Sequence, residues 1–148
     1  MATLRLLHYP ASPSAAAAPT GAGAHTDYGN LTLLATDDVG GLEVRTRAGQ
    51  WIEAPVVPGA FVVNIGDCLM RWANDVYVST PHRVVNRSVR ERYSIAFFFD
   101  PNPDAIVETI PSCVQEGEVT RYPTILAADY LKMRLAASKP AEEDRANV

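Results

Sequence analysis

Short apolar runs, separated by Gly, Pro, Asn and Asp, dominate the first hundred positions of the chain. Runs of this kind are typical of β-strands bounded by turns. The pattern predicts strands at 4–9, 31–35, 42–46, 50–54, 61–65, 76–79, 83–86 and 93–99. The run at 61–65 is apolar except for Asn64, which suits a strand buried on both faces. Arg47–Gly49 separates two of the runs and indicates a hairpin turn.

The remaining segments have a different character. Residues 10–24 are rich in Ala, Pro, Gly and Ser and predict a loop. Residues 68–72 suit one short helical turn, and Thr124 is placed to cap a helix from Ile125 to Ala137. Many short strands followed by one helix predict a mainly β fold, a sandwich or open barrel. We expect one domain over residues 1–138 and a polar, flexible tail over residues 139–148.

Composition and charge narrow the class of protein. The chain has 148 residues, of which 47% are hydrophobic, enough for one domain with a real core. The net charge of −4 argues against nucleic acid as a partner, and no apolar run is long enough to span a membrane. The two cysteines, Cys68 and Cys113, lack the spacing of metal ligands and are expected to be free thiols. We therefore expect a soluble protein of the cytoplasm, where thiols stay reduced.

Two histidines and an aspartate form the candidate metal site. In His25-Thr26-Asp27, an extended backbone would point His25 and Asp27 to the same face. His82 lies beside a predicted strand and could supply a third ligand from a folded-back sheet. Two His and one carboxylate make the facial triad of non-haem Fe(II) oxygenases. Taken alone, however, a His-x-Asp tripeptide is more often a turn or a surface pair than a pair of ligands.

A second motif, Arg92-Tyr93-Ser94, opens the predicted strand at 93–99. Arg92 would share one face with Ser94 and apolar residues, where an unpaired charge is costly. Arginine is a planar, bidentate partner for carboxylates, and the Ser94 hydroxyl can bond the same group. The alternative interpretation is a salt bridge from Arg92 to a protein acid such as Glu91 or Asp100.

Taken together, these motifs resemble a known family. His25-x-Asp27, His82 and Arg92-x-Ser94, in this order, look like the isopenicillin N synthase-like group of 2-oxoglutarate- and Fe(II)-dependent oxygenases. The stretches HTDYGNLTLLATDDVGGLEV, VVNIGDCLMRWANDVYVSTPHRVVN and ERYSIAFFFDPNPD extend the resemblance over residues 4–131. It implies a double-stranded β-helix, or jelly-roll, with the metal between two facing sheets. It also implies oxidation of a small molecule with dioxygen.

The resemblance assigns roles to individual residues. It implies that His25, Asp27 and His82 hold Fe(II), and that Arg92 and Ser94 bind the far carboxylate of 2-oxoglutarate. Tyr9 matches a family tyrosine that hydrogen-bonds the same cosubstrate. His8 should point to the face opposite Tyr9 and is expected to be structural.

Two departures from the family pattern change the expectations. The family usually has Asn two residues before the tyrosine, where this chain has Leu7. Full-length members also carry a long N-terminal region that covers one sheet, whereas this chain begins where the barrel begins. It therefore looks like the C-terminal half of such an enzyme. The uncovered sheet should expose apolar area, which predicts self-association, a partner chain or poor solubility.

Other interpretations of the same motifs stay open at this point. An Fe(II) oxidase of the same fold could use Arg92-x-Ser94 for a substrate carboxylate and dispense with 2-oxoglutarate. A truncated barrel could bind metal with little turnover. A zinc hydrolase would also suit a His and carboxylate site, although it would leave Arg92-x-Ser94 unexplained.

Overall fold

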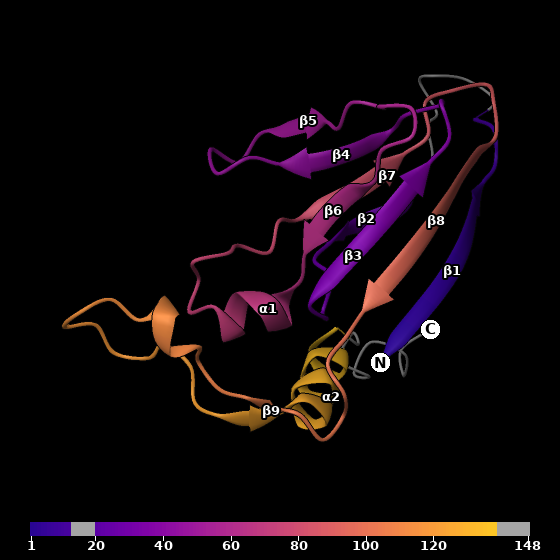
Figure 1. Ribbon diagram of the computed structural model, residues 1–148. Helices are drawn as coiled ribbons and strands as arrows, with labels where there is room; N and C mark the ends of the chain where they lie inside the picture. The colour runs from indigo at the N-terminus through magenta and orange to yellow at the C-terminus, as the bar shows by residue number, and fades with distance from the viewer. Residues whose placement is uncertain (13–19, 139–148) are drawn as a thin grey trace, which may run out of the picture.

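The computed structural model describes residues 1–12 and 20–138 (Figure 1). Its strands and helices are β1 (Ala2–Tyr9), β2 (Thr20–His25), β3 (Leu31–Thr36), β4 (Leu42–Arg45), β5 (Trp51–Glu53), β6 (Val62–Ile65), α1 (Asp67–Trp72), β7 (His82–Val85), β8 (Arg92–Phe99), β9 (Ile106–Val107), β10 (Ile125–Leu126) and α2 (Ala127–Ala137). The expected tail at 139–148 lies outside the described residues.

Two antiparallel sheets of four strands face each other. One has the order β1-β8-β3-β6 and the other β2-β7-β4-β5, while β9 and β10 form a small separate ribbon. The main core lies between them, with Tyr9, Leu34 and Ala96 from the first sheet packed against Leu42 and Val84 from the second. The predicted mainly β jelly-roll with a C-terminal helix is confirmed.

One expected loop and one expected strand are wrong. The segment Thr20–His25, expected within a loop, forms β2 because it pairs with β7, and this pairing overrides the low strand propensity of its Gly and Ala residues. Residues 76–79, expected to be a strand, form none. Asn74 and Asp75 adopt positive φ angles of 51° and 67°, which turn the chain just before the expected strand.

Two further expectations fail in detail. The C-terminal helix begins at Ala127 rather than Ile125, because Ile125 and Leu126 pair with β9 as a strand. Leu126 is the N-cap and makes no side-chain hydrogen bond, so Thr124 does not cap the helix. The run at 61–65 is not buried on both faces, since Phe61 is 62% exposed and Val63 is 55% exposed.

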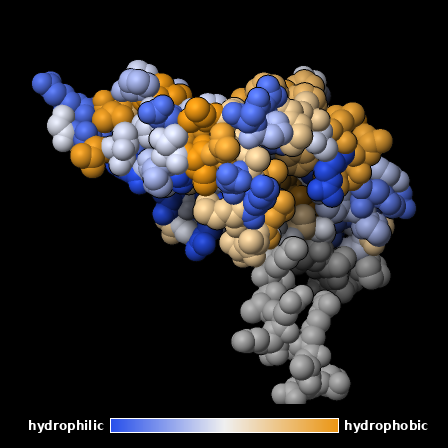
Figure 2. All heavy atoms as spheres, turned by 90° about the horizontal axis from the view of Figure 1, so that it is seen from below, coloured by the Kyte–Doolittle hydropathy of each residue, from blue (hydrophilic) through white to orange (hydrophobic). Residues whose placement is uncertain are grey.

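The outer face of the β1-β8-β3-β6 sheet is apolar, and within residues 1–12 and 20–138 nothing covers it, as expected. Leu4 and Leu6 on β1 are 63% and 76% exposed, and they pair across the sheet with Phe97 and Ile95 of β8. Val63 continues the same face on β6, beside Leu33 of β3. Figure 2, which views the molecule from below, shows apolar side chains reaching the surface in several patches.

A smaller core lies where α2 meets α1 and the β9–β10 ribbon. It contains Cys68, Val107, Ala127 and Tyr130, all nearly inaccessible to solvent. Both cysteines are free, in agreement with the expectation. Among the described residues, no helix has the length and apolar character needed to cross a membrane.

Candidate metal and cosubstrate site

The structure brings together the three residues of the predicted triad. His25 at the end of β2 and His82 at the start of β7 are direct partners across the antiparallel register. Their ring centroids lie 4.4 Å apart, and Asp27 Oδ1 lies 3.7 Å from His82 Nε2. One ligand atom from each residue can be chosen so that all three atoms lie within 4.8 Å of one another. A single metal ion can therefore contact all three.

Backbone carbonyls orient both imidazoles. The Nδ1 of His25 donates to the carbonyl oxygen of Gly23 at 2.7 Å, and the Nδ1 of His82 donates to that of Thr80 at 3.1 Å. A carbonyl only accepts, so these bonds place the proton of each neutral ring on Nδ1. Nε2 is left as a lone-pair donor in both rings, the arrangement found in metal-binding histidines.

Asp27 carries the clearest sign of a cation site. The residue is 8% exposed, and its Oδ2 is buried with no hydrogen-bond partner among the described residues. A buried carboxylate oxygen without a partner is costly, and a metal ion would compensate it. The donor set of two His and one carboxylate fits Fe(II), and it also fits Zn²⁺.

The loop between the ligands is braced from behind by residues that the sequence did not single out. Asp67 is 4% exposed and accepts a hydrogen bond from Thr26 Oγ1 at 2.9 Å. Arg134 of α2 pairs with the same Asp67 oxygen, Oδ2, at 2.7 Å. The Asp67 backbone N–H also donates to the carbonyl oxygen of Asp27 at 2.7 Å. These contacts tie helix α2 to the segment that carries two of the three candidate ligands.

Gly66 makes this close approach possible. A Cβ at this position would collide with the backbone carbonyl of Gly29. The Gly66-Asp67 pair can therefore pack directly on the segment that follows Asp27. The partners of this pair lie far away along the chain, so its role is visible only in the fold.

Arg92 is fully buried, and no acid pairs with it. Its Nε donates to the carbonyl oxygen of Gly40 at 2.6 Å and its Nη1 to Ser94 Oγ at 3.3 Å, while Nη2 has no partner among the described residues. The guanidinium carbon of Arg92 lies over the ring of Tyr9, 4.8 Å from the centroid of that ring. Glu91 instead accepts a hydrogen bond from Tyr93. The alternative of a salt bridge to Glu91 or Asp100 is therefore wrong for the described part of the chain.

The two sets of residues meet at one cavity of about 300 Å³ between the sheets. His25, Asp27 and His82 line it, as do Tyr9 and Ser94, and Arg92 lies directly behind the last two. The wall also contains Arg5, Leu7, Asn64 and Phe98. His8 also borders this cavity, but its ring stacks on Tyr93 with a centroid distance of 4.7 Å and its Nε2 lies 3.5 Å from Glu91 Oε2.

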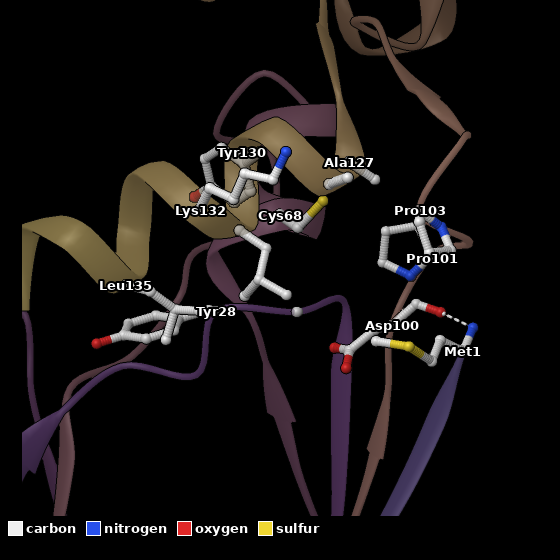
Figure 3. A pocket seen from close by; sticks show the side chains of 13 residues that line it. Met1, Tyr28, Cys68, Asp100, Pro101, Pro103, Ala127, Tyr130, Lys132 and Leu135 are labelled. Carbon is white, nitrogen blue, oxygen red and sulfur yellow. Dashed lines mark hydrogen bonds between the residues drawn. The ribbon is translucent and has the colours of Figure 1, made fainter.

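A second cavity, of about 230 Å³, lies under α2 and shares no lining residue with the first (Figure 3). Its walls come from α2, the segment after Asp27 and the chain around Asp100, beside the N-terminal Met1. Burial raises the pKa of the Cys68 thiol to about 11 and that of the Tyr130 hydroxyl to about 12. Both groups therefore stay protonated, and the cavity offers no nucleophile or metal ligand set of the kind found in the first.

The comparisons with known proteins agree with this geometry. The family model of the 2OG-Fe(II) oxygenase superfamily matches residues 2–101. The 2-oxoglutarate-Fe(II) type oxidoreductase hxnY of Emericella nidulans is 49% identical over 135 residues, which are 89% of this chain and 39% of that protein. The homoarginine-6-hydroxylase 2-ODD-233 of Oryza sativa subsp. japonica is 46% identical over 136 residues, 88% of this chain and 42% of its own length.

A solved structure gives the same result. The crystal structure of a full-length Neurospora crassa protein in complex with alpha-KG and thymine matches with a TM-score of 0.85 and 43% identity, covering 93% of this chain and 44% of that one. The chain thus spans less than half the length of the relatives that it matches. On the family match and these identities, the chain belongs to the 2OG-Fe(II) oxygenase superfamily.

Proposed function

We propose that residues 1–138 form the domain of an oxygenase that binds Fe(II) and 2-oxoglutarate and oxidises a small molecule with dioxygen. His25, Asp27 and His82 would hold the metal. Arg92, Ser94 and Tyr9 would hold the far carboxylate of 2-oxoglutarate. The relatives act on, or are solved with, small molecules according to their names, including homoarginine and thymine, and this supports a small-molecule substrate here.

The observation that carries the proposal is the environment of Arg92. A guanidinium that is 0% exposed has one nitrogen, Nη2, without a partner among the described residues and no acid beside it. Ser94 and Tyr9 place a hydroxyl and a phenol at the same point, on the wall of the cavity that also contains the triad. An anionic ligand that reached from this point to the metal would satisfy both the buried cation and the open metal positions.

The residues of this chain divide the work between positioning and shielding. When bound, Fe(II) would allow dioxygen to act as a four-electron oxidant, with two electrons taken from 2-oxoglutarate, which becomes succinate and carbon dioxide, and two from the substrate. Thr80 and Gly23 fix the two imidazoles through their carbonyl groups, and Asp67 holds the loop between the ligands. Leu34, Leu42 and Val84 close the space between the sheets and keep bulk water away from it.

The test is the affinity of the Zn²⁺-loaded chain for 2-oxoglutarate, measured by calorimetry for wild type, Arg92→Met and Arg92→Lys. Hydrogen bonds to charged groups contribute roughly 1.5–3 kcal/mol each, so Arg92→Met should weaken binding by about 100-fold. Arg92→Lys keeps the charge but not the bidentate fork, and it should fall between the two. Equal affinity in all three proteins would contradict the proposal.

A turnover assay separates this proposal from the oxidase alternative. The Fe(II)-loaded chain should form succinate from 2-oxoglutarate in the presence of oxygen. Oxygen consumption without succinate would instead indicate an Fe(II) oxidase that uses Arg92 for its substrate. Metal binding without oxygen consumption would indicate a binding barrel with little turnover.

We further propose that the apolar outer face of the β1-β8-β3-β6 sheet is covered in the working protein, by a second copy or by another polypeptide segment. Leu4, Leu6 and Ile95 form neighbouring, exposed apolar positions on this face, more than a monomeric surface usually presents together. Sedimentation of the purified chain tests this. Self-association that the double variant Leu6→Ser/Ile95→Ser abolishes would support a copy on this face, and a monodisperse wild-type monomer would point to another segment.

The chemistry also suits a reducing compartment. Cys68 and Cys113 are both free, and ferrous iron is retained where thiols stay reduced. We therefore propose the cytoplasm as the location, which fractionation of cells that express the protein would test.

A further inference from the structure

Arg5 occupies an unusual place on the first strand. It pairs with Ala96 of β8, and it lies on the same face of β1 as Leu7 and Tyr9, whereas Leu4 and Leu6 point outward. This places its side chain on the wall of the metal cavity. Nothing in the sequence pattern distinguished Arg5, since a single charge within a strand is usually a solvent-facing residue.

Arg5 has no partner within the described residues. The other charged or metal-binding side chains at the site have partners or belong to the triad: His8, which also borders the cavity, stacks on Tyr93 and lies 3.5 Å from Glu91. Arg92 donates to Gly40 and Ser94, and each histidine donates to a backbone carbonyl. The one acid among the described residues that line the cavity is Asp27, which belongs to the triad. Arg5 itself is exposed to solvent, so it is a cation at the open edge of the cavity, with no partner anion among the described residues.

If the site held Fe(II) and 2-oxoglutarate, its charges would balance without Arg5. The positive charges of Fe(II) and Arg92 are balanced by Asp27 together with the dianion 2-oxoglutarate. Arg5 adds one further positive charge at the solvent-exposed edge of the cavity, where water screens part of its field. A second anion in the same cavity would be attracted there.

Arg5 and Arg92 are attached at different levels of the first sheet. Arg92 pairs with Tyr9, which lies four positions from Arg5 on β1, so about 13 Å of strand separates their levels at roughly 3.3 Å per residue. Between them lie Leu7 and the inward side chains of β8. Two guanidinium groups at two levels of one cavity suit two separate anions, the cosubstrate at Arg92 and another molecule at Arg5.

We propose that Arg5 binds a carboxylate of the substrate, so that the substrate is a small organic acid. Its hydrocarbon part would lie against Leu7 and Phe98, within reach of the metal. This inference rests on the proposed function, because it takes Arg92 to be reserved for 2-oxoglutarate. Arg5 is then the residue that selects acids over neutral compounds.

The test uses benzoate and its neutral isostere benzamide as probes, titrated into the Zn²⁺-loaded chain already saturated with 2-oxoglutarate. Wild type should bind benzoate about 10- to 100-fold more tightly than benzamide, as expected for hydrogen bonds to a charged group. Arg5→Gln should remove this preference and leave benzamide binding unchanged. Arg5→Lys should keep part of the preference for benzoate. The control Arg47→Gln, which changes an exposed arginine in a turn, should keep the whole preference.

The outcomes separate the two hypotheses. Absence of a benzoate preference in wild type, or a preference that survives in Arg5→Gln, would overturn the role of Arg5. The affinity for 2-oxoglutarate, measured in the same samples, should be unchanged in Arg5→Gln, which also reports that the variant is folded. If wild type fails to bind 2-oxoglutarate, the proposed function itself fails, whatever the probes do.

Discussion

Two cavities flank the segment from Asp27 to Gly29, and they differ in the polar groups that they leave unsatisfied. The metal cavity has an unpartnered carboxylate oxygen on Asp27, two imidazoles with free Nε2 atoms, and Arg92 with a free nitrogen directly behind its wall, all within the described part of the chain. The cavity under α2 has shifted pKa values at Cys68 and Tyr130, yet both shifts come first from burial and keep the groups neutral. Convergent unpaired polar atoms, rather than shifted pKa values, distinguish the candidate metal cavity from the cavity under α2.

The sharpest way to test this contrast is to remove a candidate ligand. His82→Ala should weaken metal binding by at least about 100-fold, because the loss of even a residue that only supports a ligand costs roughly 10- to 100-fold. The measurement is a competition titration of Zn²⁺ against a chelator. His8→Ala is the matched control, since that ring stacks on Tyr93 instead and should leave the affinity unchanged.

Substitution of Asp67, which braces the loop that carries His25 and Asp27, should have a smaller effect on metal affinity. Asp67→Asn keeps the size of the side chain but removes the charge that pairs with Arg134 and helps to hold Thr26. We expect metal affinity to fall by about tenfold or more in this variant and in Arg134→Met. A loss of thermal stability with unchanged metal affinity would show instead that the contacts are merely structural.

A change confined to the cavity under α2 should affect stability alone. Leu131 lines this cavity and is half-buried. Leu131→Ala should lower the free energy of unfolding by about 1–2 kcal/mol, less than the roughly 2–5 kcal/mol typical of fully buried leucines. Chemical denaturation gives this value, and the affinities for Zn²⁺ and 2-oxoglutarate should stay at the wild-type level. A change in either affinity would mean that the two cavities are coupled.

The smallest effect concerns the chemistry of the thiol in the second cavity. Burial raises the pKa of Cys68 to about 11, so its reactive thiolate is scarce near neutral pH and increases as pH rises toward that value. At about pH 8, iodoacetamide should therefore modify Cys113 well before Cys68 in the folded chain, since Cys68 is also 2% exposed. Peptide mass spectrometry reads out both sites. Equal rates would show that the second cavity is open and polar.

The sequence predicted the triad because part of its signal is local. His25 and Asp27 are two positions apart on extended backbone, and Arg92 and Ser94 share one face of β8, but His82 is distant along the chain, and the resemblance to a family was needed to join the three motifs into one site. The bracing of the loop could not be predicted in this way. Asp67 meets Thr26 and Arg134 across long stretches of chain, and a Gly-Asp pair at the end of a strand is typical of an ordinary turn.

The errors in the fold have the same origin. Ile125 and Leu126 have the composition of a first helical turn, but pairing with Ile106 and Val107 makes them a strand. The residues at 76–79 have strand-like side chains, but the left-handed backbone just before them directs the chain away from both sheets. In each case a non-local contact or a backbone turn overrides local propensity.

The central claim is that 2-oxoglutarate spans the metal cavity from Arg92 to the triad. The most direct measurement is a crystal structure of the chain grown with Zn²⁺ and 2-oxoglutarate. The account predicts the metal on His25, Asp27 and His82, and the far carboxylate of 2-oxoglutarate within hydrogen-bond distance of Arg92, Ser94 and Tyr9. A metal bound elsewhere, or a 2-oxoglutarate that leaves Arg92 unpaired, would contradict it.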